Sequence, residues 1–187
     1  KALKDGASVA YVSDAGTPMV ADPGFDLARA VIAQDLPVYA APGASALLAA
    51  LCVAGQPTDR FFFAGFAPNK TSARTKFFTE FSQISATLVF YESPKRAAAS
   101  LRDMCSVFGS DRPAAFCREL TKKFEETCRG TLGELADDVS RRESVKGEIV
   151  IVLGPPLQMD LVQGDVDTAI KDALTRLRVK DAASEVA

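Results

Sequence analysis

The 187-residue sequence contains neither histidine nor tryptophan. Without histidine the chain lacks the commonest general base and metal ligand, which excludes every catalytic triad built on that residue. No CxxC pair is present either, which argues against zinc ribbons and thioredoxin-type chemistry. Because each cysteine lies in an apolar or strand-like stretch, we expect buried free thiols in a reducing compartment. The cysteines are Cys52, Cys105, Cys117 and Cys128.

Long apolar runs and an excess of positive charge are also missing. No stretch reaches the roughly 20 residues of a membrane span, and no signal peptide is recognisable, so we expect no membrane association. The 22 basic and 24 acidic residues give a net charge of −2, so no global basic field points to nucleic acid. Neither GxGxxG nor a P-loop motif is present, and the sequence gives no support for those phosphate sites.

Apolar segments and turn residues alternate along the first part of the chain. We expect buried strands at 9–12 and 36–41. A helix should begin with Asp22 as its cap and Pro23 at its first position, and another should run from Ser45 to Ala54 and stop at Gly55. This strand–helix order predicts a parallel α/β layer.

A second series of elements follows the polar segment 56–60, where we place a domain junction. The "TLGE" capping box at 131–134 predicts a helix start. The strands at 114–119 and 123–129 leave no room for a crossover helix, so this sheet should be mixed. The other expected strands are 60–65, 87–91 and 148–153, and the other helices are 73–81, one from Ser93-Pro94 to Phe108, 166–179 and one from Asp181.

These elements predict an α/β protein in three parts. Residues 1–57 should be the remainder of an N-terminal α/β domain, and 58–156 a C-terminal mixed-sheet α/β domain. Residues 157–187 should be a linker and a helical extension. The chain begins with Lys1 rather than methionine, as expected of a fragment.

Two short loops of small residues follow the first two expected strands. These are "SDAGTP", from Ser13 to Pro18, and "APGASA", from Ala41 to Ala46. In open α/β sheets ligands bind beyond the carboxyl ends of the strands, and small residues let backbone N–H groups approach them. Asp, Gly and Pro are also the usual turn residues, so the spacing alone slightly favours two plain turns with helix caps over a ligand site.

Charged residues concentrate in three further stretches. Glu92 in "FYESPKR" stands at a strand end, either stabilising the following helix or acting on a ligand. "CRELTKKFEE" (117–126) is either a solvated hairpin or a polar rim for an anionic substrate. "APNKTSARTK" (67–76) has basic residues with no acid nearby in sequence, which suits a phosphate-binding patch or an exposed helix start.

Six motifs taken together, in this order, resemble the tetrapyrrole-methylase superfamily. They are "VAYVSDAGTPMVADPG", "APGASALLAAL", "DRFFFAGFAP", "LVFYESPKR", "RELTK" and "KGEIVIVLG". Within the superfamily they look like the 16S ribosomal RNA 2′-O-ribose cytidine methyltransferases of the small-subunit I type. The resemblance covers about 9–154, and the tail at 166–187 resembles the short C-terminal region of that family.

The resemblance implies two α/β domains with S-adenosylmethionine bound in the cleft between them, the first domain being incomplete here. It implies a cytoplasmic homodimer that methylates a cytidine ribose in the decoding region of the 30S ribosomal subunit. No metal is expected. The alternatives are a methylase of a small tetrapyrrole such as uroporphyrinogen, and a non-catalytic binding module of the same fold.

The resemblance also assigns site residues. The implied cofactor contacts are Asp14, Gly16, Thr17, Ser45, Ala46, Tyr91, Leu120 and Gly147. Candidates for a base or an orienting group are Glu92, Glu119 and Lys122. Candidates for RNA phosphate positioning are Lys70, Arg74, Arg96 and Arg118. One departure is Lys95, where the family pattern leads us to expect histidine.

Overall fold

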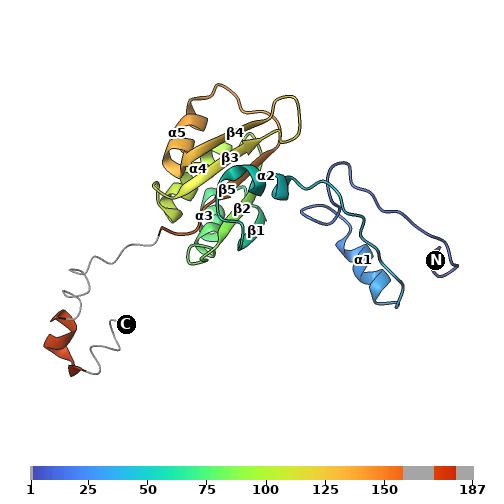
Figure 1. Ribbon diagram of the computed structural model, residues 1–187, viewed down its shortest axis with the longest axis horizontal. Helices are drawn as coiled ribbons and strands as arrows, with labels where there is room; N and C mark the ends of the chain where they lie inside the picture. Colours follow the sequence, from blue (N-terminus) through green and yellow to red (C-terminus); the bar gives the residue numbers. More distant parts are fainter. Residues whose placement is uncertain (1, 158–170, 180–187) are drawn as a thin grey trace. The chain divides into compact units, whose positions relative to one another are not determined.

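The computed structural model describes residues 2–157 and 171–179, and it divides into two compact units, Lys1–Pro156 and Leu157–Ala187. The first unit contains a five-stranded sheet in the order β1-β2-β5-β3-β4 (Figure 1). Its β1–β2 pair is parallel and its other three pairs are antiparallel, which confirms the predicted mixed sheet. The strands are β1 (Phe61–Phe66), β2 (Thr87–Glu92), β3 (Pro113–Arg118), β4 (Glu126–Thr131) and β5 (Ile149–Leu153).

The strand directions bring several loops to one end of the sheet. β1, β2 and β3 run the same way, and β5 runs against β2 and β3 between them. Ile149, the first residue of β5, pairs with Glu92 on one side and Arg118 on the other, the last residues of their strands. The loops that leave β1, β2 and β3 and the loop that enters β5 therefore share one end. We call it the carboxyl end of the sheet.

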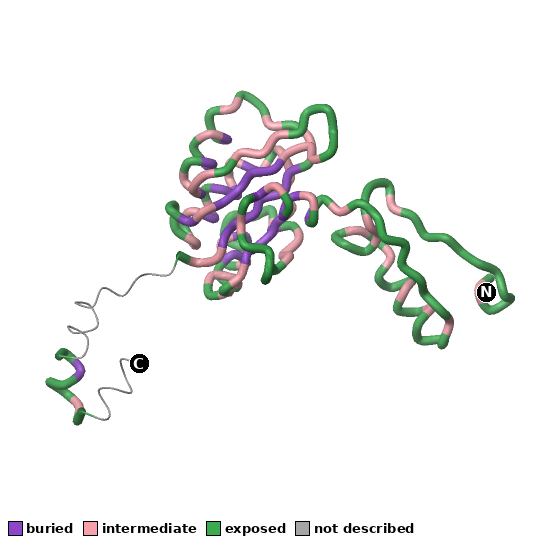
Figure 2. Tube along the Cα trace, viewed as in Figure 1, coloured by how far each residue is buried: buried purple, intermediate pink, exposed green. Residues whose placement is uncertain are grey.

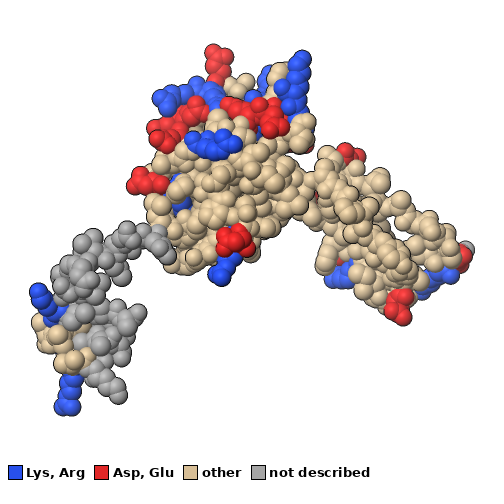
Figure 3. Space-filling view, viewed as in Figure 1, with Lys and Arg blue, Asp and Glu red and all other residues tan. Residues whose placement is uncertain are grey.

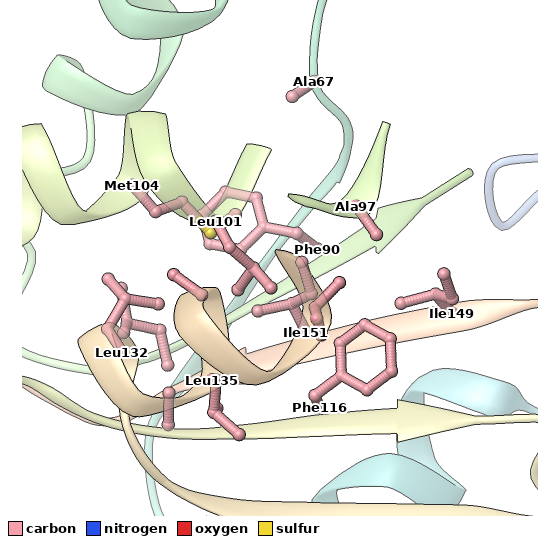
Figure 4. Close-up of a cluster of buried hydrophobic side chains, with 14 of the residues drawn as sticks. Ala67, Phe90, Ala97, Leu101, Met104, Phe116, Leu132, Leu135, Ile149 and Ile151 are labelled. Atoms are coloured by element: carbon pink, nitrogen blue, oxygen red, sulfur yellow. The ribbon is translucent and has the colours of Figure 1, made fainter. Parts of the chain in front are cut away.

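Helices cover both faces of the sheet, because side chains alternate between faces along each strand. On one face, α3 (Thr71–Thr79), α4 (Ala97–Phe108) and α5 (Leu132–Arg141) enclose a core containing Phe90, Phe116 and Ile151 (Figure 4). On the other face, α2 (Ala46–Ala54) packs Leu47 and Leu51 against Val89 and Val150. The central strands β2, β5 and β3 are thus buried on both faces.

Three helix ends follow the local signals in the sequence. Ser45 accepts a hydrogen bond from the backbone N–H of Leu48 at the start of α2, and Gly55 ends the helix in the left-handed conformation. Thr131 and Glu134 form the predicted capping box at the start of α5. The two N-terminal caps join residues three positions apart, and the stop depends on Gly55 itself, so none of the three needs a distant partner.

The first 45 residues differ from the prediction. No side chain from residue 2 to residue 46 is buried (Figure 2), and the expected strands at 9–12 and 36–41 are absent. A strand requires a paired neighbour, which an apolar run alone does not supply. The helix α1 (Phe25–Ile32) is capped by Gly24, whose φ is 127°, without a side-chain bond, so the predicted cap at Asp22 is wrong.

Two smaller predictions need correction, and a third lies partly outside the described residues. α4 begins at Ala97 rather than at Ser93-Pro94, because a turn in which Ser93 O accepts from Arg96 N comes first. All four cysteines are free, but Cys52 is exposed on α2 and only Cys117 is fully buried. Residues 171–176 are helical, whereas 166–170 and the helix expected from Asp181 lie outside the described residues. Within the described parts, no helix is both long and apolar enough to cross a bilayer.

Candidate functional site at the carboxyl end of the sheet

Tyr91, near the end of β2, links the strand to the start of α2. Its hydroxyl accepts a hydrogen bond of 3.1 Å from the backbone N–H of Leu47. Its ring makes edge contacts with Phe63 and Phe66 from β1, with centroids 4.7 and 5.5 Å away. Burial raises the pKa of Tyr91, so the phenol stays protonated at neutral pH. Ser45 and Ala46, two predicted cofactor contacts, lie at this junction.

The two small-residue loops touch each other. The Thr17 hydroxyl donates a 3.0 Å hydrogen bond to the carbonyl of Ala44. Gly16 has a φ of 78°, and a Cβ placed on it would lie 3.4 Å from the same carbonyl. Asp14 is exposed beside them. The first loop is therefore connected by hydrogen bonds to the segment before α2, and the start of α2 is connected in the same way to Tyr91 near the end of β2.

The loop after β3 meets the loop before β5 at Glu119. The Glu119 carboxylate accepts 2.9 Å hydrogen bonds from Lys122 Nζ and from the backbone N–H of Glu148. Lys122 also lies 3.1 Å from the Glu148 carboxylate. Gly147, with a φ of 92°, has Glu119 against the position where a Cβ would stand, so only glycine fits there. Leu120 packs with the α2 face of the sheet.

These contacts set the charges of the Glu119–Lys122 pair. The hydrogen bonds from Lys122 and from the Glu148 backbone lower the pKa of Glu119. The hydrogen bonds to Glu119 and Glu148 raise the pKa of Lys122. At neutral pH the pair is a carboxylate beside an ammonium group, which can accept from and donate to a bound hydroxyl.

Glu92 is almost fully enclosed, with 1% of its side chain exposed. One carboxylate oxygen accepts from the backbone N–H of Ser93 at 2.6 Å and binds the Arg96 guanidinium at 2.7 Å. The other accepts from the Ser100 hydroxyl. Arg96 also donates to the Ala67 carbonyl and to the Asn69 side chain. We call Glu92, Arg96, Ser100 and Asn69 the Glu92 cluster. It ties the loop after β1 to the loop after β2.

The predicted phosphate-binding residues fall into different environments. Arg74 is buried at 2% exposure, and its guanidinium lies 2.5 Å from Asp103, so the patch does have an acid nearby in space. Arg118 lies 2.8 Å from Glu126. Lys70 and Lys95 are exposed, and neither has an ion pair within the described part of the chain. Within the described residues, Lys70 and Lys95 thus differ from Arg74 and Arg118, whose guanidinium groups are paired with a carboxylate.

Sequence reasoning missed the partners that organise these residues. No sequence pattern points to Asn69, Ser100 or Glu148, although each bonds to a predicted site residue. The spacing of Glu92 and Arg96, four residues apart, is a signal for that ion pair. Asp103 is 29 residues from Arg74, and no local pattern joins them. Among the described residues, no group of three or more Cys, Asp or Glu side chains is placed to hold a metal ion.

This α/β sheet with small-residue loops at its carboxyl end matches a known class. The family model described as Tetrapyrrole (Corrin/Porphyrin) Methylases matches residues 1–136, and the chain belongs to that family. Over its whole length the chain is 44% identical to "Ribosomal RNA small subunit methyltransferase I" of Mesorhizobium japonicum, of which it covers 63%. The chain thus spans somewhat less than two thirds of that relative.

Solved structures agree on the fold. The crystal structure of the methyltransferase CobJ matches with a TM-score of 0.56 at 20% identity, over 75% of this chain and 62% of that one. A uroporphyrin-III C-methyltransferase from Thermus thermophilus, complexed with S-adenyl homocysteine, matches with a TM-score of 0.50 at 22% identity, over 74% and 62% of the two chains. At these identities the likeness concerns the fold alone.

Proposed function

We propose that this chain is part of an S-adenosylmethionine-dependent methyltransferase that acts on the ribose 2′-hydroxyl of a cytidine in 16S ribosomal RNA. The observation that carries the proposal is the 44% identity, over the whole chain, to a ribosomal RNA small subunit methyltransferase I. The decoding region of the 30S subunit is the proposed target, in the cytoplasm and as a homodimer. The boundary between two α/β domains near residue 57 belongs to the same proposal.

The residues at the carboxyl end suit the cofactor. Gly16 and Thr17 bring the first small-residue loop against the Ala44 carbonyl, so small residues and backbone groups lie beside the Tyr91 hydroxyl at the start of α2. A neutral lining of this kind recognises adenine and a methionine backbone by shape and backbone hydrogen bonds. The proposed contacts are Asp14, Gly16, Thr17, Ser45, Ala46, Tyr91, Leu120 and Gly147. The bound cofactor would supply a methyl group from its sulfonium.

Glu119 and Lys122 are the groups we propose to orient the acceptor hydroxyl. The ionised carboxylate can accept the hydroxyl proton in a hydrogen bond, while the ammonium group can donate to the ribose or to a neighbouring phosphate. Both are held in place by Glu148. Holding the oxygen in line with the transferring methyl group is the main requirement of a displacement reaction.

We assign Glu92 and the phosphate candidates by their surroundings. The enclosed carboxylate of Glu92 serves best as a positioning residue, since its two oxygens are occupied by Ser93, Arg96 and Ser100. Lys70, Arg96 and Arg118 remain candidates for phosphate positioning, and Lys95 joins them. Arg74 does not, because a buried guanidinium paired with Asp103 presents little surface to RNA.

The test uses the protein that contains this chain, methyl-labelled S-adenosylmethionine, and two acceptors. We expect label in 30S subunits isolated without the modification and none in uroporphyrinogen III. Nuclease digestion and mass spectrometry should then locate 2′-O-methylcytidine. Label found only in the porphyrin would replace this proposal with the small-tetrapyrrole alternative. Cofactor binding without transfer to either acceptor would indicate the non-catalytic alternative.

A further inference from the structure

The loop that joins β3 to β4 carries an exposed aromatic side chain that the proposed site does not use. We call residues 119–125 the β3–β4 loop. Phe124 in this loop is 64% exposed, although it follows a strand whose central residues are fully buried. Lys123 precedes it, with its ammonium 5.6 Å from the centre of the Phe124 ring. The loop leaves β3 at the carboxyl end of the sheet, and it also carries Glu119 and Lys122.

The base of this loop is firmly held. Lys122 N donates to the Glu119 carbonyl at 3.0 Å, and Glu125 N donates to the Lys122 carbonyl at 3.1 Å. The Thr121 N–H donates to the Glu125 carboxylate at 2.6 Å. Glu119 and Thr121 both have positive φ angles, 50° and 64°, which places the chain in a specific, tightly turned path. An aromatic side chain on such a base loses little freedom on binding, which favours affinity.

The charges around the loop leave Lys123 without an acidic partner. Glu119 and Glu148 bind Lys122, while Glu125 binds the Thr121 backbone. Glu126 binds Arg118 and Arg142. Figure 3 shows basic and acidic side chains interleaved over the end of the molecule that carries β4 and α5. Within the described residues, Lys123 has no ion pair, so its charge remains available to an anion.

We propose that Phe124 is a stacking platform for an unpaired nucleobase of the RNA substrate, and that Lys123 binds a phosphate next to that base. Proteins bind single-stranded nucleic acid with exposed aromatic rings next to basic side chains. The ring stacks on the flat face of a base, and the basic group binds the negatively charged phosphate. The proposal rests on the proposed function, since it names a contact of the same RNA substrate.

The experiment compares Phe124→Ala, Phe124→Leu and Phe124→Trp in the protein that contains this chain. The measurements are kcat and KM for methyl transfer to unmodified 30S subunits. We expect KM to rise about tenfold for Phe124→Ala and Phe124→Leu and to stay near wild type for Phe124→Trp, with kcat unchanged. Lys123→Gln should also raise KM, and its effect should shrink as salt increases, because a phosphate contact is screened.

Phe25→Ala is the matched control. Phe25 is also 64% exposed and also has a cation, Arg29, 5.6 Å from its ring centre, but it lies on α1. It should leave KM unchanged. Affinity for S-adenosylhomocysteine and the melting temperature should be equal in all variants, which separates RNA contact from damage to the fold.

Three results would overturn the inference. Phe124→Leu with a wild-type KM would show that stacking is not required, and Phe124→Ala with a wild-type KM would show that the ring is not used. A change of oligomeric state on sedimentation in Phe124→Ala would assign the ring to a protein interface instead. Wild-type protein that transfers no methyl group to 30S subunits would reject the proposed function itself, a separate outcome.

Discussion

The guanidinium of Arg142 binds the carboxylate of Glu126 through two hydrogen bonds of 2.9 Å each. Arg118 donates to the same carboxylate at 2.8 Å, so one acid joins β3, β4 and the residue that follows α5. Hydrogen bonds from these arginines, Arg142 first, lower the pKa of Glu126 from 4.5 to about 2. A carboxyl group with a lowered pKa stabilises the folded state above its unfolded pKa. That stabilisation is lost as the pH falls from about 4.5 towards 2.

Glu126→Gln should therefore lower the free energy of unfolding by about 1–2 kcal/mol at pH 7, because it removes charged hydrogen bonds that are only partly screened by solvent. The difference from wild type should shrink at pH 3. Urea unfolding at the two pH values measures it. Glu143→Gln is the control, since Glu143 is exposed and has no partner within the described residues. An equal difference at both pH values would contradict the assignment.

The capping box of α5 gives a second prediction, for stability alone. Thr131 accepts from the backbone N–H of Glu134 at 3.2 Å, and the Glu134 carboxylate accepts from Thr131 N at 2.8 Å. Thr131→Ala removes the first bond and should cost about 1 kcal/mol in the free energy of unfolding. Ser144→Ala, at an exposed position, should cost much less. A Thr131→Ala protein as stable as wild type would show that the cap contributes nothing.

The parts of the fold that the sequence predicts are those with local causes. The cap at Thr131, the stop at Gly55 and the apolar strands of the mixed sheet all follow from residues a few positions apart. The strands expected at 9–12 and 36–41 fail, because strand formation depends on a neighbour that the run itself does not specify.

The candidate site divides in a similar way. The loops after β2 and β3 are predictable from the apolar strands that precede them, whereas the two small-residue loops follow no strand in the structure. The pairing of Arg74 with Asp103 cannot be predicted from the sequence, because it joins two helices through a contact between distant positions. The ion pair of Glu92 is predictable from Arg96 four residues later. The hydrogen bond from Ser100 to Glu92 is not, because it depends on where α4 begins.

Tyr91→Phe tests the link between β2 and α2. It removes the acceptor for the backbone N–H of Leu47 while keeping the ring contacts with Phe63 and Phe66. We expect a loss of about 1 kcal/mol in the free energy of unfolding. If the start of α2 is part of the cofactor site, affinity for S-adenosylhomocysteine should also fall, as measured by calorimetry. Tyr39→Phe, at an 88% exposed side chain, should change neither quantity.

Glu92→Gln decides between positioning and proton transfer at the end of β2. Glutamine keeps the shape and can still accept from Ser93 N, but it loses the charge that holds Arg96, 2.7 Å away. Breaking a nearly buried ion pair should cost about 3 kcal/mol in stability. If Glu92 positions the loops after β1 and β2, KM for 30S subunits should rise and the pH profile of kcat should keep its wild-type shape.

A general base at this position predicts a different result. Loss of the base should lower kcat by about 100-fold or more and remove the acidic limb of the pH profile. Glu80→Gln, an exposed residue after α3, serves as the control for charge loss. Because Arg96 also holds Asn69, Asn69→Ala should reproduce the KM effect of Glu92→Gln without affecting the pH profile. Agreement between these two variants would establish that Glu92 acts through Arg96 on the loops that present Lys70 and Lys95.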